Sequence, residues 1–269
     1  MINSQDITVL LSTAEELCNK FDYVQTKKIL DKIAPMLQDQ KDSAIIYKFY
    51  LFSGICDYER HNFLSAIQCL LKCLQTIGEN SSNDRLLSKH TVMHELSLCY
   101  SAIFQQTKQA DDLMISIDYC KQALNECIDY SLIKKRTGLM EYYIESPEKY
   151  LSELVHLAVL YQSKKDYEKS NDLLDIAMVC CKRHYDWRTL GMVYDELGSN
   201  NRCLGKINKS HYYYSKALKV KSFIGNKRGL DVTVNNILTL LIQIEFNKTE
   251  SIEKADTLNF QQVLEEESL

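Results

Sequence analysis

The sequence predicts an all-α fold, a right-handed superhelix (solenoid) of about six stacked helix pairs. Three observations lead to this prediction: few turn-forming residues, apolar residues at helical spacing, and small residues that recur at a nearly constant interval. Only two prolines and eight glycines occur in 269 residues. All-β folds need many such residues at their turns, so the composition favours helices.

A recurring unit is clearest at Tyr194-Asp-Glu-Leu-Gly198, followed by Ser210, Tyr214 and Ala217. Small residues of the corresponding first helices stand at positions 14, 54, 99, 158 and 198, and a leucine stands at 238. The steps between these positions are 40, 45, 59, 40 and 40 residues. Matching second-helix residues follow at Ala66, Leu70 and Cys73 and at Ser170, Leu174 and Ala177. Units of this kind stack on one another because none can bury its apolar face alone.

The repeats are expected to form one domain over residues 1–269. Clear repeats are predicted near 47–80, 151–184 and 191–224, and degenerate repeats near 7–40, 92–128 and 231–265, which gives about 12 or 13 helices. Residues 130–150 interrupt the period. After them, Ser146-Pro147-Glu148 predicts a new helix start, with serine as the cap and proline in the first helical position.

The pattern resembles the tetratricopeptide repeat, in which small residues let paired helices approach closely. Two stretches, 149–169 and 189–218, are also similar to the repeat domains of bacterial peptide-pheromone receptors of the Rap, Rgg and PlcR type. The resemblance implies a concave groove that binds a short linear signalling peptide. The sequence departs from those receptors in two ways: the N-terminal helix-turn-helix of the DNA-reading members is not evident, and neither is the N-terminal helical bundle of the phosphatase-type members. The output step is therefore expected to lie in another chain or to be missing.

In a tetratricopeptide stack the first helices line the concave side at their second, fifth, ninth and twelfth positions. The resemblance points to Asn235 for the peptide backbone, to Asn201 beside the groove, and to Arg202 or Asp195 for charged ends. Side-chain amides can both donate to and accept from a peptide backbone. The full set of expected groove residues is Lys48, Tyr58, Tyr100, Gln162, Asp195, Ser199, Asn201, Arg202, Asn235 and Thr239.

Charge and hydropathy exclude several classes of partner. The net charge is −4 and the basic residues are spread along the chain, which argues against nucleic acid. No apolar stretch approaches the roughly 20 residues that cross a bilayer. The N-terminus lacks the basic region of a signal peptide, so the ten cysteines are expected in a reducing, cytoplasmic compartment, mostly as small core residues.

Catalytic motifs are not evident, and we predict neither an enzyme nor a cofactor. His90-Thr-Val-Met-His94 places two imidazoles four residues apart, a spacing that can bind a metal. The sequence shows no third ligand, so we predict no metal site. Two functions stay open: a receptor for a short signalling peptide, coupled to a partner or to transcription, and a constitutive adaptor for a segment of a larger protein. A homodimer is also left open.

Overall fold

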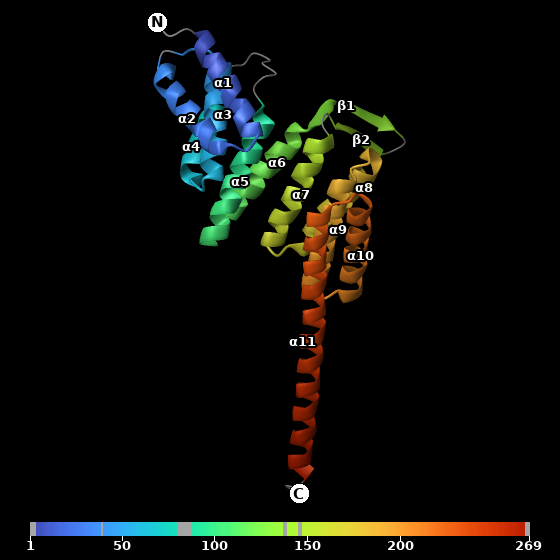
Figure 1. Cartoon of the computed structure of the whole chain (residues 1–269). Coiled ribbons are helices and arrows are strands. Elements are labelled where there is room, and N and C mark those ends of the chain that lie inside the picture. Colours follow the sequence, from blue (N-terminus) through green and yellow to red (C-terminus); the bar gives the residue numbers. More distant parts are fainter. Residues whose placement is uncertain (1–3, 39, 80–87, 137–138, 145–146, 267–269) are drawn as a thin grey trace. The chain divides into compact units, whose positions relative to one another are not determined.

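Figure 1 shows the computed structural model of the chain. It describes the backbone of residues 4–38, 40–79, 88–136, 139–144 and 147–266, and the side chains of residues 6–38, 40–78, 88–127 and 147–246. The chain divides into two compact units, Met1–Leu160 and Tyr161–Leu269. A single domain over the whole chain stays a prediction.

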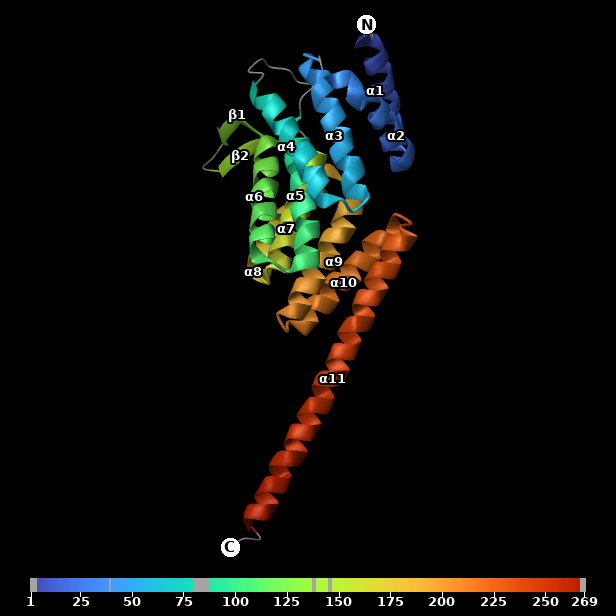
Figure 2. The ribbon, with the colours of Figure 1, turned by 90° about the vertical axis from the view of Figure 1, so that its left-hand side faces the viewer.

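The first unit contains three helix pairs, then a β-hairpin and most of a further helix. Its elements are α1 (Ser4–Asn19), α2 (Tyr23–Ile33), the short 3-10 helix η1 (Ala34–Leu37), α3 (Ser43–Glu59), α4 (Phe63–Glu79), α5 (Lys89–Thr107), α6 (Ala110–Glu126), β1 (Ile128–Arg136), β2 (Leu139–Ile144) and α7 (Pro147–Ser163). Figure 2 shows α5 and α6 lying side by side. The predicted helix start at Pro147 is confirmed, whereas its predicted cap, Ser146, lies outside the described residues.

The hairpin occupies the segment in which the sequence interrupts the repeat. Strands β1 and β2 are antiparallel, with Ile128 opposite Ile144 and Arg136 opposite Leu139. The segment contains several Ile and Tyr residues, and such residues favour strands. The all-α class is confirmed for the repeats, and the hairpin is an insertion between α6 and α7 that the sequence analysis did not predict.

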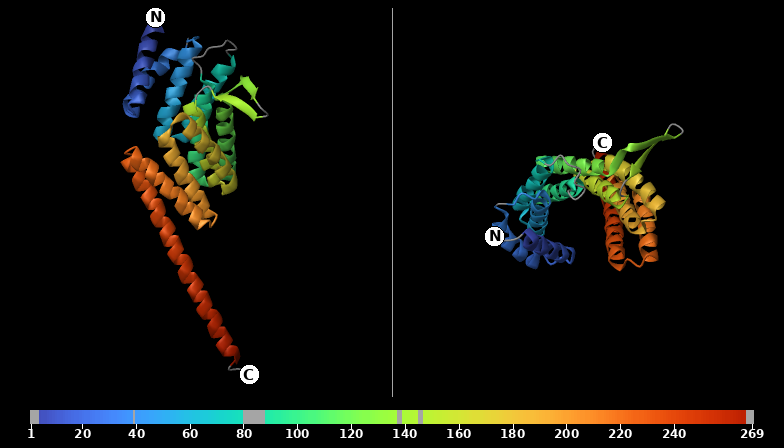
Figure 3. Two further views of the ribbon diagram at one scale, coloured as in Figure 1. Left: turned by 90° about the vertical axis from the view of Figure 1, so that its right-hand side faces the viewer. Right: turned by 90° about the horizontal axis from the view of Figure 1, so that it is seen from above.

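The second unit begins within α7 and continues through α8 (Tyr167–His184), α9 (Trp187–Cys203), α10 (Ile207–Phe223) and α11 (Lys227–Glu266). The predicted helix pair at 231–265 is wrong, because a single helix of 40 residues spans this region. The described residues therefore form eleven α-helices rather than 12 or 13. Figure 3 shows α11 continuing beyond the ends of α9 and α10.

Residues with positive φ explain both the turns and the long last helix. Short loops between helices each contain one such residue, and these are Phe21, His61, Lys108, Lys165, Tyr185, Gly205 and Gly225. Three pairs of them, 21 and 61, 165 and 205, and 185 and 225, stand 40 positions apart, which is the period of the repeat. A left-handed residue ends a helix because its backbone turns away from the helical path. No described residue within α11 adopts this conformation, so the helix continues.

Side-chain caps fix where the helices begin. Asp22, Asp166 and Asp186 each accept a hydrogen bond from the backbone N–H three residues later, over 3.1, 3.3 and 3.0 Å. Such caps satisfy N–H groups that have no partner inside the helix, and each contributes about 1 kcal/mol. Two of these aspartates stand 20 residues apart, one at the second helix of a pair and one at the first helix of the next.

The small residues of the repeat lie at the closest helix contacts. Ala14, Cys99 and Ala158 are fully buried, and Gly54 and Gly198 are buried as well. The second-helix residues are also buried, namely Thr26, Leu30 and Ile33, Ala66, Leu70 and Cys73, Ser116, Cys120 and Ala123, Ser170, Leu174 and Ala177, and Ser210, Tyr214 and Ala217. The predicted register is confirmed over five repeats. It fails at the sixth, where Leu238 is 51% exposed.

The cysteines belong mainly to the core. Eight of the ten are buried and all are free thiols, while Cys69 is half-buried and Cys203 is exposed. Burial raises the pKa of Cys56 to about 12 and that of Cys99 to about 12, so these thiols stay protonated and unreactive. Within the described residues no helix is long and apolar enough to span a bilayer.

Candidate functional site

Asp195, expected at a charged peptide end, instead belongs to a buried polar cluster. Its carboxylate accepts hydrogen bonds from the ammonium group of Lys221 and from Thr233 Oγ1, the latter over 2.8 Å. Lys221 Nζ also donates to Gly229 O, over 3.1 Å. Burial raises the pKa of Asp195, and the hydrogen bonds from Lys221 and Thr233 oppose that rise. The cluster joins α9, α10 and α11. Because Asp195 is buried within it, this carboxylate is not available to bind the charged end of a peptide.

Gln162 lies in a second polar network, which joins α7 to α9. Its amide nitrogen donates to Asn200 Oδ1 over 2.7 Å and to Glu196 Oε2 over 3.2 Å. Asn200 is buried, and its own amide donates to Ser170 Oγ over 2.8 Å. Burial raises the pKa of Glu196, although the contact with Gln162 opposes the rise. The half-buried Gln162 therefore has its donors occupied and helps to fix α7 against α9.

Three further predicted residues of α9 differ in accessibility. Asn201 is only 4% exposed, and its amide donates to Leu197 O over 2.7 Å. Ser199 and Arg202 are half-buried, and Arg202 Nη1 donates to Gln243 Oε1 of α11 over 3.3 Å. Ser199 and Arg202 can contact a ligand at the surface of this unit, whereas Asn201 cannot without a rearrangement.

The predicted residues of the first unit are half-buried and engaged with their own neighbours. Lys48 Nζ lies 2.9 Å from Glu15 Oε2, so this cation is paired with α1. Rings of Tyr58 and Phe63 have centroids 5.6 Å apart, and those of Tyr100 and Tyr119 lie 5.9 Å apart. A cleft of about 600 Å³ lies at the α3–α4 turn and the end of α5, and is lined by His61, Asn62, Phe63, Leu64, Ser65, Ile103, Gln106 and Thr107. The sequence analysis missed this cleft.

The predicted positions of α11 form an exposed stripe. Asn235 and Thr239 are both exposed. Val232, Ile242 and Phe246 are 49%, 71% and 63% exposed. Spacings of three and four residues place these five side chains on one face of a helix. The stripe combines an amide, a hydroxyl and three large apolar groups, which is the chemistry expected of a surface that binds an extended or helical segment.

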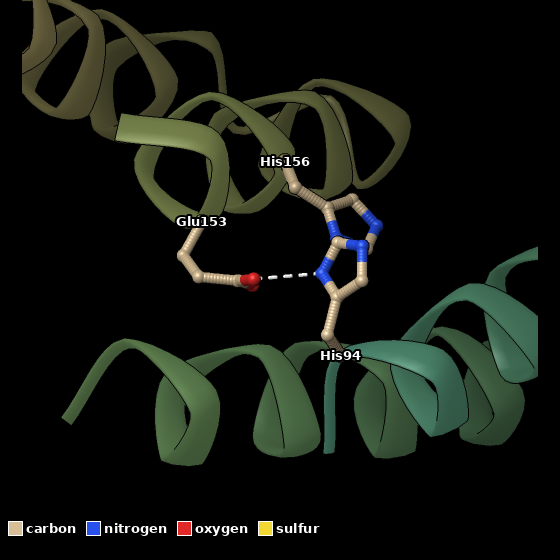
Figure 4. A group of neighbouring side chains, drawn as sticks. All are labelled: His94, Glu153 and His156. Atoms are coloured by element: carbon tan, nitrogen blue, oxygen red, sulfur yellow. Dashed lines mark ion pairs between the residues drawn. The ribbon is translucent and has the colours of Figure 1, made fainter. Parts of the chain in front are cut away.

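Another cluster lies within the first unit, between α5 and α7. Figure 4 shows Glu153 and His156 projecting from α7 towards His94 of α5. His94 Nδ1 lies 2.7 Å from Glu153 Oε1, and His90 Nε2 lies 3.2 Å from the same oxygen. Donor atoms of His94, Glu153 and His156 all lie within 4.8 Å of one another. Sequence reasoning missed Glu153 and His156, although their Glu-x-x-His spacing puts both on one helix face and could have revealed them.

Burial and charge shape the cluster. Burial opposes ionisation of Glu153, but the contacts with His90 and His94 outweigh it and lower its pKa to about 2. Burial alone would lower the pKa of His94, but the hydrogen bond with Glu153 and its negative charge outweigh burial and raise that pKa. Burial and the nearby His94 lower the pKa of His156 to about 4, which keeps this imidazole neutral at pH 7.

Comparison with protein-family models gives no match, and comparison with curated proteins gives none either. Solved structures do match. The apo form of the quorum sensor NprR from B. thuringiensis is similar, with a TM-score of 0.68 and 15% identity over 91% of this chain and 62% of that one. A Rap protein complexed with Competence and Sporulation Factor has a TM-score of 0.54 and 15% identity over 93% and 74% of the two chains.

A thermophilic tetratricopeptide-repeat protein of Thermus thermophilus matches as well, with a TM-score of 0.55 and 12% identity over 86% of this chain and 99% of that one. At these identities the similarity establishes the fold. The chain therefore has an all-α helical-repeat fold of the tetratricopeptide type. Within that class it resembles the repeat domains of the Rap and NprR proteins, as the sequence pattern predicted.

Proposed function

We propose that the chain is a cytoplasmic receptor that binds a short signalling peptide on the exposed stripe of α11 and on the adjoining side chains of α9. The observation that supports this proposal most directly is the exposure of all five stripe residues on one helix face. Arg202 of α9 contacts α11 beside the stripe through its hydrogen bond to Gln243, and Ser199 lies three residues before Arg202 on α9.

The composition of the stripe suits a peptide. Val232, Ile242 and Phe246 offer apolar area, and removal of such area from water contributes about 25 cal/mol per Å². Asn235 can donate to and accept from a peptide backbone at once, which fixes the register of an extended ligand. Apolar groups would thus supply most of the affinity, and the amide would orient the peptide.

Two of the similar structures support the proposal of a peptide receptor. The Rap structure is described as a complex with Competence and Sporulation Factor, and NprR is described as a quorum sensor. We infer by analogy that this chain responds to a peptide and passes the response to a partner protein or to transcription. It acts by binding rather than by catalysis, and a homodimer is one form that the receptor can take.

A constitutive adaptor is the second candidate, because the apolar surface of α11 is wider than the stripe. Val234, Leu238 and Leu241 are 45%, 51% and 51% exposed and extend the apolar face to one side. A broad apolar face of this kind suits the amphipathic helix of a larger protein, which binds through residues at helical spacing.

The two functions can be separated by capture from native cytoplasm. The full chain is immobilised beside an Ile242→Asp variant and a Val179→Asp control, in which an exposed residue of α8 is changed instead. Bound material is analysed by mass spectrometry for both peptides and proteins. We expect a peptide of about 5 to 10 residues on the wild type and the control only.

Each alternative result has a defined meaning. Recovery of one large protein that Ile242→Asp abolishes, with no peptide, identifies an adaptor. Equal recovery by Ile242→Asp and the wild type would exclude the stripe of α11 as the binding surface.

A further inference from the structure

Four side chains from two helices converge inside the first unit. His90 and His94 stand four residues apart on α5, and Glu153 and His156 stand three residues apart on α7. Both spacings place the paired side chains on one face of their helix. Rings of His90 and His94 are stacked with centroids 6.2 Å apart, and those of His94 and His156 have centroids 5.7 Å apart.

Several imidazole nitrogens of this cluster are buried. They are both ring nitrogens of His90, Nδ1 of His94 and Nδ1 of His156. Two of them, His90 Nε2 and His94 Nδ1, form ion pairs with Glu153 Oε1 over 3.2 and 2.7 Å, whereas His90 Nδ1 and His156 Nδ1 have no partner among the described residues. A buried polar atom without a partner destabilises the folded state. The cluster therefore has donor atoms that the described residues leave unsatisfied.

The donor atoms are close enough to share one ion. Zinc binds imidazole nitrogen and carboxylate oxygen at about 2.0 to 2.2 Å, so ligand atoms in a tetrahedral site lie about 3.3 Å apart. Those of His94, Glu153 and His156 lie within 4.8 Å of one another, with the His94–Glu153 pair at 2.7 Å. Small rotamer adjustments of the three side chains would bring their donor atoms to coordination distance. His90 Nε2 contacts the same carboxylate oxygen over 3.2 Å but lies outside this group of three donors.

We propose that His94, Glu153 and His156 bind a divalent transition metal ion of the zinc type in the first unit, with His90 beside the carboxylate of Glu153. Imidazole ligands favour Zn²⁺, Ni²⁺ or Cu²⁺ over Mg²⁺ and Ca²⁺, which take oxygen ligands. Glu153 is 1% exposed, so its carboxylate would neutralise part of the charge of a desolvated ion.

Cys120 has a supporting role in this site. Its Sγ donates to Glu153 Oε2 over 3.5 Å and to Glu153 O over 3.6 Å. The thiol thus contacts the oxygen that does not face His94, and it holds the carboxylate in orientation. Metal ligands in proteins are commonly oriented by an outer hydrogen bond of this kind.

The ion would join two helices that are distant in sequence. Between α5 and α7 lie α6 and the inserted hairpin, which make this the longest interruption of the repeat. A cross-link that closes a long segment removes conformational freedom from the unfolded chain. The inferred role of the ion is therefore to fasten α7 to α5 across the insertion. This role is independent of the proposed peptide binding on α11.

The test uses the full chain without a polyhistidine tag, stripped with a chelator and titrated with Co²⁺ and with Zn²⁺. We expect one ion per chain, the visible absorption of four-coordinate Co²⁺ that Zn²⁺ displaces, and a higher Tm with metal. His94→Ala and His156→Ala should each weaken binding at least tenfold. His184→Ala and His211→Ala, which change exposed histidines of α8 and α10, should leave it unchanged.

Circular dichroism and a thermal melt of each metal-free variant show whether it folds. If His94→Ala does not fold, the metal affinity of His156→Ala provides the test. The inference is overturned if Co²⁺ gives no such absorption, or if a folded His156→Ala variant binds as tightly as the wild type. In that event the four side chains form a buried ion-pair network only. Neither result affects the interpretation of the peptide-binding experiment on α11.

Discussion

Gly198 of α9 lies directly against the ring of Tyr214 of α10. A methyl group at position 198 would lie 2.5 Å from both Cδ1 and Cε1 of that ring. Gly54 of α3 and Leu70 of α4 have the same 16-residue separation, and a methyl group at position 54 would lie 2.9 Å from Leu70 Cγ. A small residue in the first helix and a large one in the second thus set the distance between paired helices.

This contact predicts that Gly198→Ala destabilises the protein by roughly 1 to 3 kcal/mol, because Tyr214 is buried and its ring cannot move away. Gly78→Ala is the matched control. Gly78 is an exposed helical position, and no described atom of another segment lies within 4 Å of the added methyl group, so alanine there should stabilise by up to about 1 kcal/mol. Urea unfolding followed by circular dichroism measures both, and equal effects would contradict the packing argument.

The buried pair of Lys221 and Asp195 predicts a non-additive result. Lys221→Met should cost about 3 to 5 kcal/mol, because it leaves the Asp195 carboxylate buried without its cation. Adding Asp195→Asn to Lys221→Met should recover part of this loss, since neither charge is then left alone. Urea unfolding of both single variants and the double variant measures the coupling, and strict additivity would exclude it.

The Lys221→Met variant should also depend on pH in a defined direction. Burial already raises the pKa of Asp195, and loss of the cation removes an opposing influence, so the folded-state pKa rises further above the unfolded value. A group with a raised folded-state pKa favours the folded state more as the pH falls. The stability deficit of Lys221→Met relative to the wild type should therefore shrink between about pH 7 and pH 4. A deficit that grows in this window would contradict the assignment.

The exposed amide of α11 predicts a change in binding without a change in stability. Asn235→Ala should weaken binding of a peptide found by the capture experiment, while the free energy of unfolding stays within about 1 kcal/mol of the wild type. Titration calorimetry and thermal melts give the two quantities. Unchanged affinity would remove Asn235 from the proposed contact with the peptide backbone.

The exposure of Cys203 predicts that this thiol reacts faster than the others. It is exposed, whereas Cys69 is half-buried and the other eight cysteines are buried. A thiol reagent under native conditions should therefore modify Cys203 first, Cys69 more slowly, and the rest only as the protein unfolds. Cys203→Ser should abolish the fast phase. Rapid modification of several thiols in the Cys203→Ser variant would mean that the helix pairs open readily.

The repeat register could be read from the sequence because it depends on local spacing. Residues three, four and seven positions apart share a helix face, so Ala14, Cys99 and Ala158 could be placed at helix contacts without any knowledge of their partners. The same pattern could not reveal that α11 is one helix. A helix pair would need a turn between its two helices, and α11 contains none. In the sequence this was indicated by Leu238, which stands where the repeat has a small residue.

The sequence by itself thus determined the class of fold, the position of five helix pairs and the burial of most cysteines, because these follow from short-range periodicity and side-chain size. Tertiary structure decided which polar residues are accessible. Asp195 meets Lys221 and Thr233, and His94 meets Glu153 and His156, across helices that are separated in the chain. Such meetings depend on how one helix is rotated against another, and packing of the whole unit sets that rotation.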